Sequence, residues 1–323
     1  MTSAPALLIV HQGAMGDLVC IFPIIAALRR RFRPVGILCQ GHLGRLAAAE
    51  GLVEVWFPIE AAWTASLFTA RARPEACSRL APFSHILCFS ASEALAAALG
   101  GISGAMVCRI PPRPPASDRV HASDHARQRV LSCGWLSDTD AGDMADDPLG
   151  ASCRAAGGPA LALLHPGAGS PRKRWPLECF LSLAEHLRGR RRRSGFLIGP
   201  AEEDILPELE RRGERVIRPM DAIELIARLR TAWAYVGNDS GVSHLAGWAG
   251  VPSVVIFGPS DPERWRPRGR CVEVVQAAPA CAPCFEREDG GCTSVDCLDR
   301  IRIESVLQAF DRVVSSKVDR VGR

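Results

Sequence analysis

The sequence predicts an α/β protein with two Rossmann-like halves, each built on a parallel sheet. Short apolar segments alternate with stretches of helical spacing, which is the pattern of repeated βαβ units. The pattern occurs twice, and residues 138–159, rich in Asp, Gly, Ala, Ser and Pro, form a candidate linker. The 323 residues suit two domains of about 150 residues each. We therefore expect a ligand in a cleft between the halves, at the carboxyl ends of the strands.

The first half opens with an apolar run at residues 6–11, which is expected to form a buried strand. A turn that contains glycine leads into residues 18–31, whose apolar positions have helical spacing. The remaining elements expected in this half are strands at 35–39, 52–57 and 84–89 and a helix at 91–99.

The second half restarts the pattern with a strand at residues 160–165. Further strands are expected at 195–199, 216–217, 233–237 and 253–258. The expected helices are 177–187, 202–211, 221–229, 240–248 and 303–314. Asp221 is the expected N-cap of the third of these helices, because a short carboxylate can accept hydrogen bonds from the first free amides.

Composition excludes several classes of protein. Hydrophobic residues make up 47% of the chain and charged residues 23%, which excludes a wholly disordered, collagenous or coiled-coil protein. The sequence predicts neither a membrane-spanning helix nor a signal peptide. Thirteen cysteines are scattered over both halves, which predicts a cytosolic protein with mostly reduced thiols.

Lysine is rare in this chain. Lys173 and Lys317 are the only lysines among 39 basic residues, and the other basic residues are arginines. A GC-rich genome explains the bias, because it shifts lysine codons towards arginine. A lysine that lies inside a motif is therefore more informative than usual.

The first turn, residues 11–17, reads His-Gln-Gly-Ala-Met-Gly-Asp. Gly13 and Gly16 allow the backbone to pass close to a ligand, although their spacing is not that of the G-x-G-x-x-G dinucleotide motif. Asp17 lies near the start of the first helix, where the macrodipole favours a carboxylate. It is either a capping residue or a catalytic residue that faces the ligand.

The second turn, residues 165–176, places Gly167, Ser170 and three cations between a strand and a helix. Such a loop can offer backbone N–H groups and positive charge to phosphates. Lys173 is the notable cation, since lysine is a common point-charge partner of phosphate. The alternative is a solvated basic loop.

The third turn contains Asn238, Asp239 and Ser240, which are all favourable N-cap residues. Ser240 and Gly241 are expected to open a helix whose free amides can bind a diphosphate. Asp239 is either part of this site or a simple cap. His244 is either a buried histidine with its hydrogen bonds satisfied or a residue that faces the ligand.

Four cysteines near the end of the chain have the spacing C-x2-C-x7-C-x4-C. These residues, Cys281, Cys284, Cys292 and Cys297, are enough to hold a structural Zn²⁺ or iron ion in a tetrahedral site. The second pair lacks the familiar C-x2-C spacing. Reduced structural cysteines or one disulfide are therefore the alternatives.

Arginine-rich runs occur at residues 29–33 and 188–193. They are compatible with an anionic membrane surface, with a phosphorylated acceptor, or with ordinary solvated helix ends. The runs carry no interleaved aromatic residues and no recognised binding motif, so a nucleic-acid partner is not expected.

The three turns together resemble glycosyltransferase family 9, the lipopolysaccharide heptosyltransferases. The cysteine segment 281–285, with Cys292 and Cys297, is also similar to a segment found in many members. The resemblance spans almost the whole chain and is strongest in the C-terminal half. The matching segments are 13–17 with Pro23, 165–170 with 173–176, 237–241 with 244–245, and 257–262.

The resemblance implies a GT-B fold. Residues 1–150 would form the acceptor-side domain and residues 151–302 the nucleotide-sugar donor domain. The last helix, within residues 303–323, would pack back on the N-terminal domain. The implied reaction moves heptose from ADP-L-glycero-D-manno-heptose to a phosphorylated lipopolysaccharide core acceptor. It would invert the anomeric centre and require no metal or other cofactor for catalysis.

The resemblance also implies roles for single residues. Asp17 would be the general base, and Lys173 would stabilise charge on the departing diphosphate. Glu203 would bind the ribose, with Glu202 and Asp204 as competitors, and Met220 would line the adenine pocket. The expected donor-binding residues are Gly13, Gly16, Ser170, Glu203, Met220, Asp239, Ser240, Gly241 and His244.

The implied location is the cytoplasm, peripheral to the inner membrane of a Gram-negative bacterium. Residues 61–82 and 109–124 carry no family feature and leave the acceptor open, so another glycan or a protein is an alternative. Two further interpretations are a GT-B enzyme that uses UDP- or GDP-sugars, and a non-catalytic protein with a cysteine-bound metal.

Overall fold

We analysed a computed structural model of the chain, which describes residues 4–68, 74–115, 117–137, 160–277, 283–286, 292 and 296–315. The chain divides into two compact units, Met1–Pro148 and Leu149–Arg323. The candidate linker at residues 138–159 lies outside the described residues.

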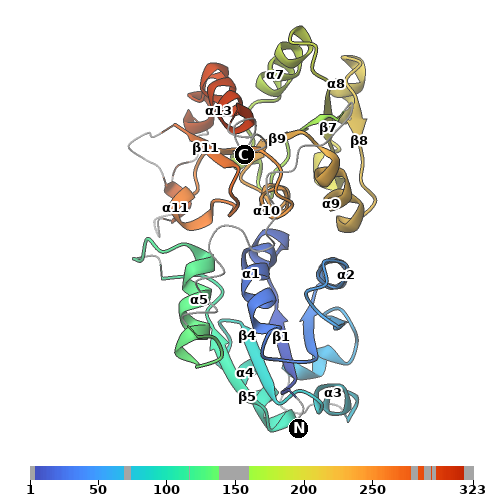
Figure 1. The fold of residues 1–323 in the computed structure, drawn as a ribbon, viewed down its shortest axis with the longest axis vertical. Helices are drawn as coiled ribbons and strands as arrows, with labels where there is room; N and C mark the ends of the chain where they lie inside the picture. The colour runs from blue at the N-terminus through green and yellow to red at the C-terminus, as the bar shows by residue number, and fades with distance from the viewer. Residues whose placement is uncertain are drawn as a thin grey trace, which may run out of the picture. The chain divides into compact units, whose positions relative to one another are not determined.

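The first unit is built on a five-stranded parallel sheet with the strand order β3-β2-β1-β4-β5 (Figure 1). Its strands are β1 (Leu7–His11), β2 (Val35–Cys39), β3 (Val55–Pro58), β4 (His85–Phe89) and β5 (Met106–Ile110). The chain turns to the opposite side of the sheet after β3, so that β1 and β4 lie side by side. In a parallel sheet of this order, the point between such strands is the usual place for a ligand.

Helices cover both faces of this sheet. They are α1 (Met15–Leu28), α2 (Gly41–Ala49), α3 (Pro74–Leu80), α4 (Glu93–Ser103) and α5 (Ala122–Ser132), with a short 3-10 helix η1 (Thr64–Phe68). Leu8 and Val10 of β1 are fully buried in one core with residues of α3, α4 and η1. The intervening side chains, such as that of Ile9, point to the other face, since side chains alternate along a strand. Each such leucine or isoleucine stabilises the fold by about 1.5–3 kcal/mol through burial.

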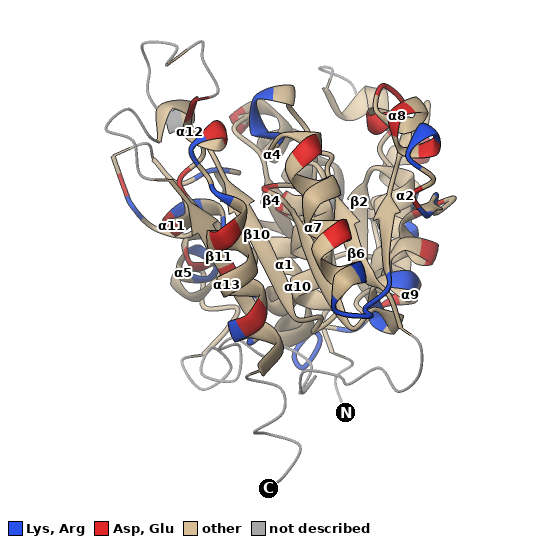
Figure 2. Ribbon diagram, turned by 90° about the horizontal axis from the view of Figure 1, so that it is seen from above, with Lys and Arg blue, Asp and Glu red and all other residues tan. Residues whose placement is uncertain are grey.

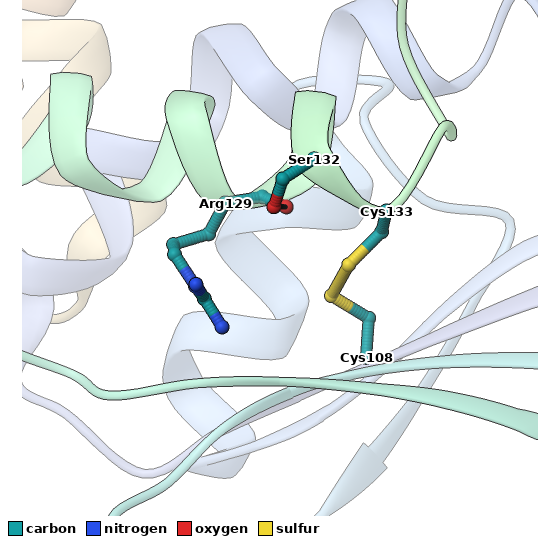
Figure 3. The surroundings of a disulfide bond; sticks show 4 residues. All are labelled: Cys108, Arg129, Ser132 and Cys133. Carbon is teal, nitrogen blue, oxygen red and sulfur yellow. Dashed lines mark hydrogen bonds between the residues drawn. A yellow bond between two sulfur atoms is a disulfide. The ribbon is translucent and has the colours of Figure 1, made fainter.

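A disulfide joins Cys108 of β5 to Cys133 at the end of α5, with the two Cα atoms 6.6 Å apart (Figure 3). It fixes the end of α5 to the edge strand of the sheet. The sequence does not predict this pair, because 25 residues separate the two cysteines and only the fold brings them together. Eight cysteines within the described part of the chain keep free thiols.

The second unit is built on a six-stranded parallel sheet with the order β11-β10-β9-β6-β7-β8. Its strands are β6 (Ala162–His165), β7 (Ser194–Leu197), β8 (Val216–Ile217), β9 (Ala234–Asn238), β10 (Ser253–Phe257) and β11 (Val272–Gln276). Here β6 and β9 lie side by side at the point where the strand order reverses. Both described sheets therefore have the Rossmann-like order that the sequence predicts.

The helices of the second unit follow its strands. They are α7 (Leu177–Gly189), α8 (Leu206–Arg211), α9 (Ala222–Thr231), α10 (Gly241–Trp248), α11 (Pro262–Trp265), α12 (Asp296–Asp299) and α13 (Ile303–Ser315). Short 3-10 helices are η2 (Pro171–Lys173), η3 (Pro200–Glu202) and η4 (Cys284–Glu286). No helix in the described ranges has the length and apolar character that crossing a bilayer requires.

The last helix belongs to the core of the second unit. The apolar side chains of α13 recur at helical spacing and are buried in the core of the second unit, beside Val254 and Ile256 of β10 and Phe180 of α7. The prediction that this helix also packs back on the N-terminal domain stays a prediction. The apolar stripe predicts burial, but it does not predict which sheet the stripe covers.

The predicted helix at 202–211 is the other clear difference. The chain forms η3 and then α8, which begins only at Leu206. Pro207 lies in the first turn of α8, where its missing N–H costs no intrahelical hydrogen bond. A helix that began at Glu202 would place this proline in its interior, so the proline determines where the helix can start.

Candidate functional site

The loops that follow β6 and β9 leave the same edge of the second sheet. The two strands pair in parallel, with His165 opposite Gly237. The loop after His165 and the loop after Asn238 therefore lie next to each other, at the point where the strand order reverses. This is the position at which open parallel sheets bind their ligands.

Asn238 holds the first of these loops in place. Its fully buried side-chain amide nitrogen donates to the carbonyl oxygens of Pro166 and Gly167, at 2.8 and 3.3 Å. The side-chain oxygen of Asn238, Oδ1, accepts a hydrogen bond from the backbone N–H of Trp175, at 3.0 Å. One side chain thus fixes both ends of the loop. The sequence predicts only a capping role for Asn238, because its role in fixing the loop requires the adjacency of β6 and β9.

We expect Asn238→Ala to lower the free energy of unfolding by about 3 kcal/mol or more. The substitution leaves buried backbone groups without partners, and each such group costs about 1–3 kcal/mol. Urea denaturation should be compared with that of Ser182→Ala, which removes an exposed 2.8 Å hydrogen bond to the carbonyl of Glu178 in the same unit. Equal, small losses for both variants would contradict the role assigned to Asn238.

Lys173 connects the two loops by an ion pair. Its ammonium group donates to Oδ2 of Asp239 at 2.7 Å, with the lysine side chain 25% exposed and the aspartate side chain 7% exposed. The same ammonium lies 5.6 Å from the centre of the Phe285 ring, and the guanidinium of Arg172 lies 4.7 Å from it. The aromatic ring and the carboxylate thus hold two cations at this edge while the lysine stays open to solvent.

The start of α10 adds hydrogen-bond donors beside Lys173. Ser240 is the N-cap, and its side chain accepts from the backbone N–H of Ser243 at 3.4 Å. Within the described ranges, no hydrogen bond is recorded for the backbone N–H groups of Gly241 and Val242. A helix start with free amides and a neighbouring ammonium group attracts anions. The arrangement can therefore bind a phosphate or diphosphate.

Ser170 and His244 have mainly structural surroundings. Ser170 precedes η2, and its hydroxyl accepts from the backbone N–H of Arg172 at 3.3 Å. His244 is buried in α10 with 7% of its surface exposed. Of the two alternatives for His244, the structure favours the buried histidine.

Three acidic residues after β7 have three different surroundings. Glu202 is buried, accepts from the backbone N–H of Gly199 at 2.9 Å, and has a raised pKa because burial penalises its charge. Asp204 binds the guanidinium of Arg174 through both oxygens, at 3.2 and 2.9 Å. Glu203 is exposed and pairs with Arg218. Glu203 is therefore more open to a ligand than Glu202.

Met220 is exposed over 92% of its surface, which is unusual for a large apolar side chain. It follows β8 and precedes α9, so it belongs to the same edge of the sheet as His165. Asp221 caps α9 as predicted, with its side chain accepting from the backbone N–H groups of Ile223 and Glu224 at 3.0 and 2.9 Å. The short loop is thus well fixed, while the methionine itself is uncovered.

Two buried histidines border the predicted site residues. Burial lowers the pKa of His165 to about 4, and nearby Arg174 adds to the shift. Burial also lowers the pKa of His11 to about 4, against an opposing effect of Asp17. Both imidazoles are therefore neutral at pH 7. The Nδ1 atom of His165 lies 3.4 Å from the hydroxyl of Ser240.

We expect these histidines to make the fold acid-sensitive. Below pH 6.5 these histidines bind protons in the unfolded chain, whereas in the folded chain they stay neutral down to about pH 4. The free energy of unfolding therefore falls as the pH falls. Each histidine should lower the free energy of unfolding by about 2 kcal/mol between pH 7 and pH 5. Urea denaturation at both pH values should show a smaller loss for the His11→Gln/His165→Gln variant. Parallel profiles for the variant and the wild type would contradict this expectation.

The first turn belongs to the first unit, after β1. Oδ2 of Asp17 accepts from the backbone N–H of Ala14 at 3.0 Å, so the capping role is present. Within the described part of the chain, no hydrogen bond is recorded to its other carboxylate oxygen. A side chain at Gly13 would place Cβ 2.8 Å from Cβ of Asp17 and 2.9 Å from the ring of His11, so only glycine fits there. Gly16 lies in the first turn of α1.

Polar side chains surround this turn. The hydroxyl of Ser90, after β4, donates to Oε1 of Gln12 at 3.2 Å. The amide of Gln40, after β2, donates to the carbonyl of Gly13 at 3.4 Å. The carboxyl ends of three neighbouring strands thus form a polar edge around Asp17. Such groups can hold the hydroxyls of a sugar.

Arg172 contacts two of the four residues of the predicted cysteine site. Arg172 donates to the sulfur of Cys284 at 3.8 Å and to the carbonyl oxygen of Cys292. Among the residues that the structure describes, no group of three or more His, Cys, Asp or Glu side chains is arranged to hold a metal ion. Cys281 lies outside those residues, whereas Cys284, Cys292 and Cys297 are described. These three thiols do not fit a shared metal, and we derive no step through one.

The part of the chain that carries this arrangement is similar to a known family. Residues 136–291 match the model of glycosyltransferase family 9 (heptosyltransferase), which includes both loops of the anion site. No curated protein matches the sequence.

Solved structures show the same fold over nearly the whole chain. A family 9 glycosyl transferase from Veillonella parvula has a TM-score of 0.75 at 15% identity and covers 98% of this chain and 99% of its own. The ADP-heptose lps heptosyltransferase II of E. coli has a TM-score of 0.72 at 14% identity, and the match covers 97% of this chain and 99% of that one. E. coli heptosyltransferase WaaC with ADP has a TM-score of 0.68 at 18% identity, and the match covers 95% of this chain and 99% of that one. The chain therefore has the GT-B fold of these structures, and its residues 136–291 are similar to glycosyltransferase family 9.

Proposed function

We propose that the protein transfers heptose from ADP-L-glycero-D-manno-heptose to a lipopolysaccharide core acceptor, with inversion at the anomeric centre. The observation that carries this proposal is the Lys173–Asp239 pair beside the start of α10, which suits a diphosphate. The family match supports sugar transfer. The E. coli relatives, described with ADP or ADP-heptose, support the choice of donor.

We assign the donor's parts to the edge of the second sheet. The diphosphate binds Lys173 and the backbone N–H groups of Gly241 and Val242. The ribose hydroxyls bind Glu203, which is exposed, and the adenine ring covers Met220. Covering an apolar side chain that is 92% exposed removes it from water and therefore favours binding of a flat ring.

The reaction needs a base and a stabilised leaving group. Asp17 takes the proton of an acceptor hydroxyl while that oxygen attacks the anomeric carbon of the heptose. The bond from this carbon to the diphosphate oxygen breaks, and ADP leaves with the electron pair. Lys173 and the amides at the start of α10 stabilise the negative charge that develops on ADP. No step requires a metal.

The acceptor and the location belong to the same proposal. A phosphorylated lipopolysaccharide acceptor places the enzyme at the cytoplasmic face of the inner membrane. The arginine runs support an anionic surface only in part, because Arg29, Arg188 and Arg190 already pair with carboxylates of the chain. Polar groups around Asp17, including Gln12 and Gln40, suit acceptor hydroxyls.

Calorimetric titration with a panel of nucleotides tests the donor assignment. We expect ADP to bind at least about tenfold more tightly than UDP or GDP, since only adenine is assigned to Met220. Chelation of divalent metals should leave transfer unchanged. Tighter binding of UDP than of ADP would overturn the ADP-heptose assignment.

A further inference from the structure

A cavity of about 400 Å³ lies at the opposite edge of the second sheet. Leu161, which precedes β6, Arg193, which precedes β7, and Arg215, which precedes β8, all line it. These residues stand at the amino ends of their strands, whereas the anion site uses the carboxyl ends. Since β6 alone spans about 13 Å, the cavity is separate from the donor site.

The cavity is lined by both apolar and cationic side chains. Leu161, Leu163 and Ile217 supply apolar side chains, and Leu163 is almost fully buried. The cationic side chains come from three exposed arginines at 193, 215 and 228. In Figure 2 a blue stretch of ribbon runs beside α9 and β6. The cavity thus combines an apolar floor with a positive rim.

Among the residues that the structure describes, two of the three guanidinium groups have no acidic partner. Arg228 pairs with Glu224 at 2.9 Å. Within the described ranges, no ion pair or hydrogen bond is recorded for the side chains of Arg193 and Arg215. An arginine fork matches phosphate oxygens in charge and geometry. Two such forks suit one phosphate group of the ligand.

The surface next to the cavity also combines a cationic and an apolar side chain. The guanidinium of Arg192 lies 5.1 Å from the ring centre of Trp233, which is partly exposed. Tryptophan and arginine together are favoured where a protein meets the boundary between water and lipid. A free inorganic anion would leave the exposed parts of Leu161 and Ile217 in water. An anion with an attached apolar part would cover them.

We propose that this cavity binds the phosphate headgroup of an anionic amphiphile, with the adjoining apolar part of that molecule on Leu161, Leu163 and Ile217. The proposal does not depend on the donor or the acceptor of the transfer reaction. Its test therefore measures binding and not turnover.

Cosedimentation with vesicles is the first experiment. We expect the full chain to bind phosphatidylglycerol vesicles and not phosphatidylcholine vesicles, and Arg193→Gln/Arg215→Gln to weaken binding at least about tenfold. The control is Arg45→Gln/Arg129→Gln, which changes the net charge equally at exposed positions of the first unit. Its binding should stay within about twofold of the wild type. An equal loss in both variants would overturn the proposal.

Calorimetry distinguishes an amphiphile from a free phosphate. We expect dihexanoyl phosphatidylglycerol, below its micelle concentration, to bind at least about tenfold more tightly than glycerol 3-phosphate, because only the former covers the apolar floor. Leu161→Gln should reduce this difference and leave the glycerol 3-phosphate affinity unchanged. Equal affinities for the two probes, or binding insensitive to Arg193→Gln/Arg215→Gln, would overturn the proposal.

Discussion

Replacement of Asp17 by asparagine should lower the turnover number of transfer by roughly 10²- to 10⁴-fold, which is the range that general base catalysis contributes. Asparagine keeps a side-chain oxygen for the backbone N–H of Ala14, which donates to Asp17 at 3.0 Å in the wild type. The start of α1 should therefore stay folded. What the variant loses is the ability to take a proton from the acceptor hydroxyl.

The measurement separates chemistry from binding. Turnover should be measured from the release of ADP, and the affinity for ADP should be measured by calorimetry. This affinity should change less than about twofold, because the donor is assigned to the other unit. Asp124→Asn is the matched control, since Asp124 also lies in the first turn of a helix of the first unit. Asp124→Asn should keep wild-type turnover. Full turnover by Asp17→Asn would remove Asp17 as the base.

The strand pattern and the three turns were predictable because they depend on local sequence. Apolar runs at 35–39 and 216–217 match β2 and β8 as the structure has them. The N-cap Asp221 was also expected, and Ser240 was one of three candidates, since capping needs only a short polar side chain beside free amides. Helices α2, α3 and α5 and strands β5 and β11 were not predicted.

Roles that depend on distant contacts were not predictable. Asn238 fixes the loop at residues 166–175 only because β6 and β9 are neighbours across a crossover. Phe285 holds two cations whose positions are more than 100 residues away in the chain. The side-chain types alone carry no signal for these pairs. Alternation of strands and helices predicts that two sheets form, but it does not state which loops meet.

Lys173 should show the second large effect. Lys173→Met removes the ammonium from the diphosphate site and should lower turnover by roughly 10²- to 10³-fold, as the loss of one charge-stabilising donor does elsewhere. Lys173→Arg keeps the charge, but its planar fork cannot place a single donor between Asp239 and a phosphate oxygen in the same way. We expect an intermediate loss for this variant.

A second variant is needed because Lys173→Met also leaves Asp239 without its partner. Asp239 is only 7% exposed, so an unpaired carboxylate there destabilises the fold. The double variant Lys173→Met/Asp239→Asn removes both charges and should recover the free energy of unfolding lost in Lys173→Met, as measured in urea. Its turnover should stay as low as that of Lys173→Met if the ammonium acts on the leaving group. Recovery of turnover together with stability would show that Lys173 serves the fold and not the chemistry.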